Sequence, residues 1–330
     1  MKPLTSGGRS LRDAFVALLS LIPSVLAGWW FWSNVGSGLA DGILLTFAVL
    51  IGTWGSCGFG IMYLDLKWLM YKKKHHDAAT YVPRLDLSSR RMSQTDFEHL
   101  SIEPGIEEFT ASNSRLTSID LSPLSGNIQL RKVDLSFNQL ESIDLRPLAT
   151  CSGIEELVLH TNELREVDLS PLRSFMNLKE IVLHSNRIRS IDLSPLAALS
   201  ALEYLDLSGN SLGSIDLSPL RSCPKLETLG LGSNRLQYLD LGPLSQCKEL
   251  RALVVGDNKL EDLNLLPLAS IPGLETISLN DIGRIDISPL FQSFSLLKLY
   301  ASGSQLVARQ APPRADWPKA LRTHRITIEE

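Results

Sequence analysis

Eight near-copies of one hexapeptide run through the chain at an almost fixed spacing, and this repetition constrains the fold more than any other feature. The first copy is IDLSPL, and successive copies begin 24 residues apart, except the last, which follows after 22 residues. The copies begin at Ile119, Ile143, Val167, Ile191, Ile215, Leu239, Leu263 and Ile285. A fixed period of about 20 to 50 residues predicts stacked units, each burying its apolar face against its neighbours.

A complete unit reads L-x-x-L-x-L-x-x-N-x-L-x-x-I-D-L-S-P-L, as residues 202–220 illustrate. The alternating apolar residues of YLDLS predict a short strand with Leu205 and Leu207 inward. Asn210 should end the strand and bond backbone groups that the strand leaves unpaired. Ser218 is expected to be the N-cap of one helical or 3₁₀ turn, with Pro219 at its first position.

These residues resemble the leucine-rich repeat family, whose signature L-x-x-L-x-L-x-x-N-x-L recurs about every 20 to 29 residues. The resemblance covers roughly residues 100–306, or about nine units. It implies an α/β solenoid that is curved, with a parallel sheet on its concave face, and it implies that this face binds proteins. The partner itself is not identified by the resemblance.

Two uncharged apolar stretches precede the repeats, at residues 14–32 and 42–64. At about 1.5 Å per residue, each is long enough to cross a hydrocarbon layer of about 30 Å. A cleaved signal peptide is the alternative for the first stretch, but a second stretch follows after only nine residues. We therefore predict an N-terminal transmembrane α-helical hairpin surrounded by membrane lipid, and the repeats begin late because this anchor comes first.

The distribution of basic residues predicts the orientation of the hairpin. The loop between the two stretches has no Lys or Arg, whereas both flanks are basic, with Lys2, Arg9, Arg12, Lys67, Lys72, Lys73 and Lys74. The positive-inside rule then places both termini in the cytoplasm of a two-pass integral membrane protein. The chain has no N-x-S/T sequon, and Cys151, Cys223 and Cys247 share one apolar column. We interpret them as core thiols, with a Cys223–Cys247 bridge as the alternative.

Small residues recur at every fourth position in both apolar stretches. They are Ser20, Ser24 and Gly28 in the first stretch and Gly52, Ser56 and Gly60 in the second. Such a face allows close helix approach. It predicts either packing within the hairpin or a homo-oligomer.

The predicted organisation follows from these patterns. The parts are a cytoplasmic N-terminus (1–13), a first transmembrane helix (14–32), a short external loop (33–41), a second transmembrane helix (42–64), a basic juxtamembrane linker (65–82), a leucine-rich repeat domain with its N-terminal cap (83–306), and a C-terminal cap or tail (307–330).

Candidate binding residues occupy the outward positions of neighbouring strands. The most distinctive cluster combines apolar groups, expected to be exposed, with two histidines one strand spacing apart. It consists of Val158, His160, Val182, His184, Tyr204 and Asp206. We refer to these six residues as the sheet-face cluster. An ordinary solvated sheet surface is the alternative interpretation.

Charge and motifs exclude several other functions. Residues 101–300 carry 17 Lys and Arg against 26 Asp and Glu, a net charge of −9, which disfavours nucleic acid. An aspartate recurs within the hexapeptide, and we expect it to accept backbone N–H groups of its own turn, with a calcium ladder as the alternative. The sequence has no P-loop, H-E-x-x-H or C-x-x-C motif. We expect no catalytic residue, cofactor or metal.

The sequence thus favours a membrane-anchored module that presents a leucine-rich repeat surface to a protein partner on the cytoplasmic side. A surface receptor or adhesin with an extracellular solenoid is one alternative. A structural scaffold that assembles through the membrane hairpin is another.

Overall fold

The structure is a computed structural model, and it describes residues 83–90, 102 and 105–329. The predicted hairpin (14–64) and most of the segment leading to the repeats lie outside the described residues, so the hairpin and its orientation stay predictions. In the part of the chain that is described, no helix is long and apolar enough to span a bilayer.

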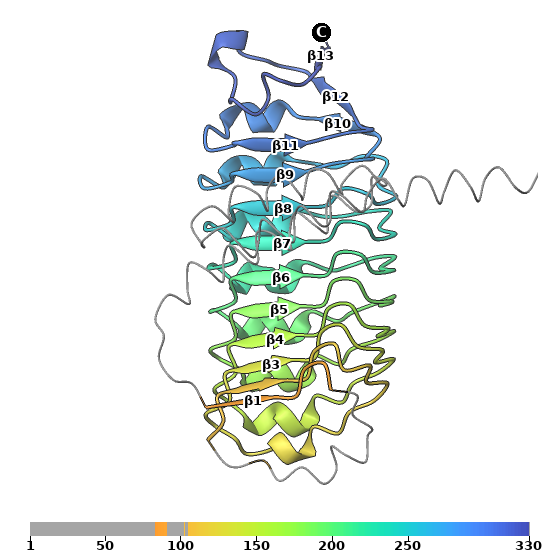
Figure 1. Cartoon of the computed structure of the whole chain (residues 1–330). Helices are drawn as coiled ribbons and strands as arrows, with labels where there is room; N and C mark the ends of the chain where they lie inside the picture. Colours follow the sequence, from red (N-terminus) through yellow and green to blue (C-terminus); the bar gives the residue numbers. More distant parts are fainter. Residues whose placement is uncertain (1–82, 91–101, 103–104, 330) are drawn as a thin grey trace, which may run out of the picture. The chain divides into compact units, whose positions relative to one another are not determined.

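Ten parallel strands form one sheet, stacked in the order in which they occur in the chain except that β10 is left out (Figure 1). The strands are β1 (Arg84–Asp86), β2 (Glu108–Thr110), β3 (Lys132–Asp134), β4 (Glu156–Val158), β5 (Glu180–Val182), β6 (Tyr204–Asp206), β7 (Thr228–Gly230), β8 (Ala252–Val254), β9 (Thr276–Ser278) and β11 (Lys298–Tyr300). Equivalent residues of successive units pair, so Leu205 lies between Ile181 and Leu229. The predicted solenoid with a parallel sheet is confirmed.

A short 3₁₀ helix crosses the opposite side of each of the eight coils that begin with β2 to β9. These helices are η1 (Ser122–Leu124), η2 (Arg146–Thr150), η3 (Ser170–Ser174), η4 (Ser194–Ala198), η5 (Ser218–Ser222), η6 (Gly242–Gln246), η7 (Leu266–Ser270) and η8 (Ser288–Gln292). Each of these helices has a proline near its start. The proline ring fixes φ at a helical value, and the missing N–H would have no partner within the helix at that position. The expectation that Ser218 caps η5 is wrong. Leu217 is the N-cap residue, and Ser218 is the first residue of the helix.

The interior of the coils is a continuous apolar core. Leu205, Leu207 and Leu220 are fully buried, and Leu217 is nearly so. β6 ends at Asp206, and Asn210, four residues on, bonds backbone groups as predicted. Its Oδ1 accepts the N–H of Ile188 at 3.0 Å, and its Nδ2 donates to Leu183 O and Leu207 O, both at 3.0 Å. The same bonds recur in other coils and form a ladder at Asn138, Asn162, Asn186, Asn210, Asn234 and Asn258.

The three cysteines of the repeats are free and buried. The Sγ of Cys223 lies 3.4 Å from Leu196 O, and that of Cys247 lies 3.3 Å from Leu220 O, so each thiol can donate to the coil before it. The Cys223–Cys247 bridge is therefore not formed, and the core-thiol interpretation agrees with the structure.

The C-terminal residues pack over the last coil. A second parallel sheet joins β10 (Arg284–Asp286), β12 (Gln305–Ala308) and β13 (Thr327–Ile328). The helix η9 (Arg314–Asp316) leads into Trp317, whose ring lies 5.0 Å from that of Phe291. The Nε1 of Trp317 donates to Pro312 O at 2.8 Å. Since Trp317 and Leu321 are buried, this segment covers the end of the core as a cap.

Candidate functional site

The sheet-face cluster lies on β4, β5 and β6 and in the turns that follow β4 and β5. All six side chains are buried, with exposed fractions of 0% for Val158, 1% for Val182 and 2% for Tyr204. The expectation of exposed apolar groups is therefore wrong. Val158, Val182 and Tyr204 form an apolar cluster separate from the main core. Strand spacing brings equivalent positions within contact of each other, so these side chains pack together on the outer face.

The two histidines of the cluster stack on each other. The rings of His160 and His184 are 4.4 Å apart between centroids and inclined by 12°. Phe137, on the preceding coil, meets His160 edge-on at 4.9 Å and 83°. The Nδ1 atom of His160 also lies within hydrogen-bonding distance of Thr161 Oγ1, at 3.1 Å. We call Phe137, His160 and His184 the aromatic row.

Phe137 is the member of the row that faces solvent, with 55% of its surface exposed. Its φ is +56°, in the left-handed region that a bulky residue rarely adopts. Most turns of this column share a positive φ but carry small or polar residues: Asn113, Thr161, Ser185, Gly209, Ser233, Asp257, Asp281 and Gly303. Phe137 was not among the predicted site residues. An aromatic residue in a column of turn formers is the signal that identifies it.

Tyr204 and Asp206 form a polar contact beside the apolar cluster. The Tyr204 hydroxyl donates to Asp206 Oδ2 at 3.4 Å, and Asp206 Oδ1 accepts the N–H of Ser208 at 2.9 Å. Asp206 is fully buried. Its carboxyl group is therefore engaged within the sheet face.

The aspartates of the hexapeptide serve their own turns. Oδ1 of Asp168, Asp192 and Asp216 each accepts the N–H two residues on at 2.8 Å. Asn264 makes the same bond at 3.0 Å without the charge. A side-chain hydrogen bond and a backbone hydrogen bond from Arg146 lower the pKa of Asp144 to about 2. The local interpretation of this column is confirmed.

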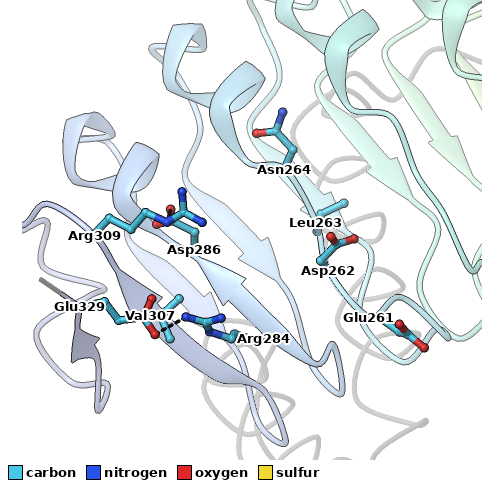
Figure 2. A pocket seen from close by; sticks show the side chains of 9 residues that line it. All are labelled: Glu261, Asp262, Leu263, Asn264, Arg284, Asp286, Val307, Arg309 and Glu329. Carbon is cyan, nitrogen blue, oxygen red and sulfur yellow. Dashed lines mark hydrogen bonds and ion pairs between the residues drawn. The ribbon is translucent and has the colours of Figure 1, made fainter.

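A charged cavity of about 360 Å³ opens on the flank near the C-terminal end (Figure 2). Glu261, Asp262 and Asn264 line one wall, and β10, β12 and the C-terminal segment line the other. The second wall is internally paired, because Arg284 bonds Glu329 and Arg309 Nε lies 3.5 Å from Asp286 Oδ2. Its arginines therefore tie the cap to the last coils.

Comparisons with known proteins agree with this architecture. Residues 176–236 match the family model described as leucine rich repeat. A search among curated proteins found no match to the sequence. A leucine-rich repeat protein from Leptospira interrogans is similar in structure, with a TM-score of 0.55, 20% identity, and coverage of 74% of this chain and 65% of that one.

An internalin (inlF) from Listeria monocytogenes has a TM-score of 0.50 and 22% identity, with coverage of 72% of this chain and 71% of that one. At such identities these likenesses show the fold alone. The fold of the described part of the chain is that of a leucine-rich repeat protein. This chain spans 65% of the length of the Leptospira protein.

Proposed function

We propose that this protein is a membrane-anchored interaction module that presents its repeat sheet to a protein partner, on the cytoplasmic side. The observation that carries the binding role is the aromatic row on an otherwise regular ten-stranded sheet. Leucine-rich repeat folds generally serve as binding modules and not as enzymes, and we propose no catalytic role.

Phe137 is the proposed centre of the contact. An exposed aromatic ring in a left-handed turn contributes little to the core and stores backbone strain, which is a feature of functional positions. Aromatic anchors dominate binding energy in protein interfaces. His160 packs edge-on against the ring and stacks in turn on His184, and the other four residues of the sheet-face cluster lie on strands β4 to β6.

Substitution of Phe137 tests this proposal. Phe137→Ser places at this turn the residue that Ser185 and Ser233 supply at the same φ, so folding should be retained or improved. Tyr238→Ser is the matched control, because Tyr238 is 74% exposed in a different column. The measurement is quantitative cross-linking in membranes. The amount of partner recovered with the wild type and with the control should be similar, and Phe137→Ser should lower it at least about tenfold. Equal recovery with all three proteins would refute the role of the row.

The membrane anchor rests on the two uncharged stretches and the basic flanks described above. Protease protection of sealed vesicles, with a tag at Glu330, tests its orientation. Digestion only after the cytoplasmic face is exposed supports the proposal. Digestion from outside would favour the surface receptor or adhesin instead.

The scaffold alternative has its own test. Gly52→Ile and Ser56→Ile place bulk on the small-residue face of the second stretch. Loss of a detergent-stable oligomer with insertion intact would favour assembly through the hairpin. An unchanged oligomeric state would remove that alternative.

A further inference from the structure

The last strand of the ten-stranded sheet, β11, has a neighbouring strand on one side only. It pairs in parallel with β9, and the chain after it enters the second sheet, where β12 pairs with β10 and β13. In Figure 1 the C-terminal segment, drawn in dark blue, lies beyond β11, but no strand of the described residues extends the large sheet there. Leu299 of β11 is 6% exposed, whereas the equivalent Leu253 and Ile277 of the two strands before it are 0% exposed.

Backbone groups that join one coil to the next elsewhere have no such partner on this side of β11. After β9, the N–H of Leu279 donates to Tyr300 O at 2.6 Å. Ala301 is the equivalent residue of the last coil, and no described residue accepts its N–H. Likewise, Glu275 O accepts the N–H of Leu297 at 2.8 Å, but the equivalent Leu297 O accepts from no described residue. We call this side the free edge of β11, and an extended backbone placed parallel to it would satisfy both groups.

The side chains beside the free edge are unusually apolar. Leu297 is 59% exposed and Phe294 is 78% exposed. In the preceding coils the column of Leu297 is charged, since Arg251 Nη1 lies 2.9 Å from Glu275 Oε1. Every second residue of a strand lies on the same side of the sheet, so a segment beside Leu297 and Ala301 should be apolar at alternate positions.

The charge of the C-terminal segment selects the remaining positions. Residues 301–325 carry five Lys and Arg against one Asp, a net charge of +4, in contrast to the acidic repeats. Four of these basic residues are exposed and have no ion pair with a described carboxylate: Arg314, Lys319, Arg322 and Arg325. Arg309 differs, because its Nε lies 3.5 Å from Asp286 Oδ2. Charge complementarity therefore favours an acidic ligand at this end of the solenoid.

We propose that an extended acidic segment of a partner protein adds to the free edge of β11 as an eleventh parallel strand. Its backbone bonds Leu297 O and the N–H of Ala301, its apolar residues lie beside Leu297, and its carboxylates are attracted by the basic C-terminal segment. This contact does not depend on the one proposed at Phe137. A second copy of this chain is a poorer occupant, because two copies that meet at this end bring two positively charged segments together.

Peptide binding to the full chain in detergent tests the proposal. The probe is a fluorescent synthetic peptide of alternating Val and Glu, and a peptide of alternating Val and Lys is its control. Ala301→Pro removes the N–H at the free edge, where proline is tolerated, and should weaken binding of the Val/Glu peptide at least about tenfold. Ala301→Val keeps the N–H and places there the residue that Val255 supplies in an earlier coil, so binding should be unchanged. Equal binding by Ala301→Pro, or equal binding of the two peptides, overturns the proposal.

Hydrogen exchange of the wild type keeps the proposal testable if Ala301→Pro does not fold. The amide of Ala301 should exchange rapidly in the protein alone, while that of Leu279 is protected. The Val/Glu peptide should slow exchange at Ala301 at least about tenfold. No change at Ala301 overturns the proposal. Protection that rises with protein concentration in the absence of peptide would assign the edge to a second copy and would also overturn it.

Discussion

At the scale of single residues, the regular stacking of the coils depends on one amide side chain in the turn after each of β3 to β8. Asn210 joins two consecutive coils, because it accepts from Ile188 and donates to Leu183 in the coil before it and also donates to Leu207 of its own coil. Asn210→Ala leaves these buried groups without a partner, and we expect a loss of about 2 to 4 kcal/mol in the free energy of unfolding. Urea denaturation measures it. Asn264→Ala, which removes one exposed turn bond, should cost under about 1 kcal/mol.

A second feature at the scale of single residues is the burial of the cysteine thiols, which thiol reactivity measures. Burial raises the pKa of Cys223 to about 12, with the nearby Cys247 adding to the shift, and burial raises that of Cys247 to about 11. Few thiolates are therefore present at pH 8, and we expect neither residue to react with a thiol reagent in the folded protein. Peptide mass spectrometry in a Cys57→Ser background should show labelling only in denaturant. Rapid labelling without denaturant would mean that these coils open readily.

At the scale of elements, glycine is required where adjacent turns approach most closely. A Cβ added to Gly256 would lie 2.5 Å from the backbone N of Asn280, which cannot move aside without disturbing the hydrogen bond from Asp257 N–H to Asn280 O. Gly256→Ala should therefore lower stability by about 1 to 3 kcal/mol. Gly213→Ala meets nothing within 4 Å and should be neutral or slightly stabilising. Thermal unfolding compares the two, and equal effects would contradict the close approach.

The elements also show what a repeat predicts and what it does not. Because the units repeat every 24 residues, equivalent strands can pair in only one register that keeps their apolar side chains on the same face. The order and pairing of β2 to β9 therefore follow directly from the sequence. The second sheet was not predicted, because β10 belongs to the shortened unit and β13 lies beyond the repeats. Alternation shows which face Val158 occupies but not how tightly neighbouring side chains pack on it. Phe137 does not follow from this alternation, because it lies in a turn and not on a strand.

For the described repeat domain as a whole, stability is approximately a sum of coils and of contacts between neighbouring coils, so an unprotected end frays first. The cap counters this at the C-terminal end, where Trp317 packs on Phe291 and Leu321 closes the core. Trp317→Ala removes that cover. We expect it to raise hydrogen exchange in residues 284–308 at least about tenfold, with little change in β4 to β6.

The control for the cap is an aromatic residue of the same coil that does not cover the core. Phe294 is 78% exposed, so Phe294→Ala should leave exchange nearly unchanged. Uniform loss of protection along all strands in Trp317→Ala would mean that the coils unfold as one cooperative unit. Loss confined to the last coils would show that stability is local, so that the C-terminal end of the solenoid can open without unfolding the coils around Phe137.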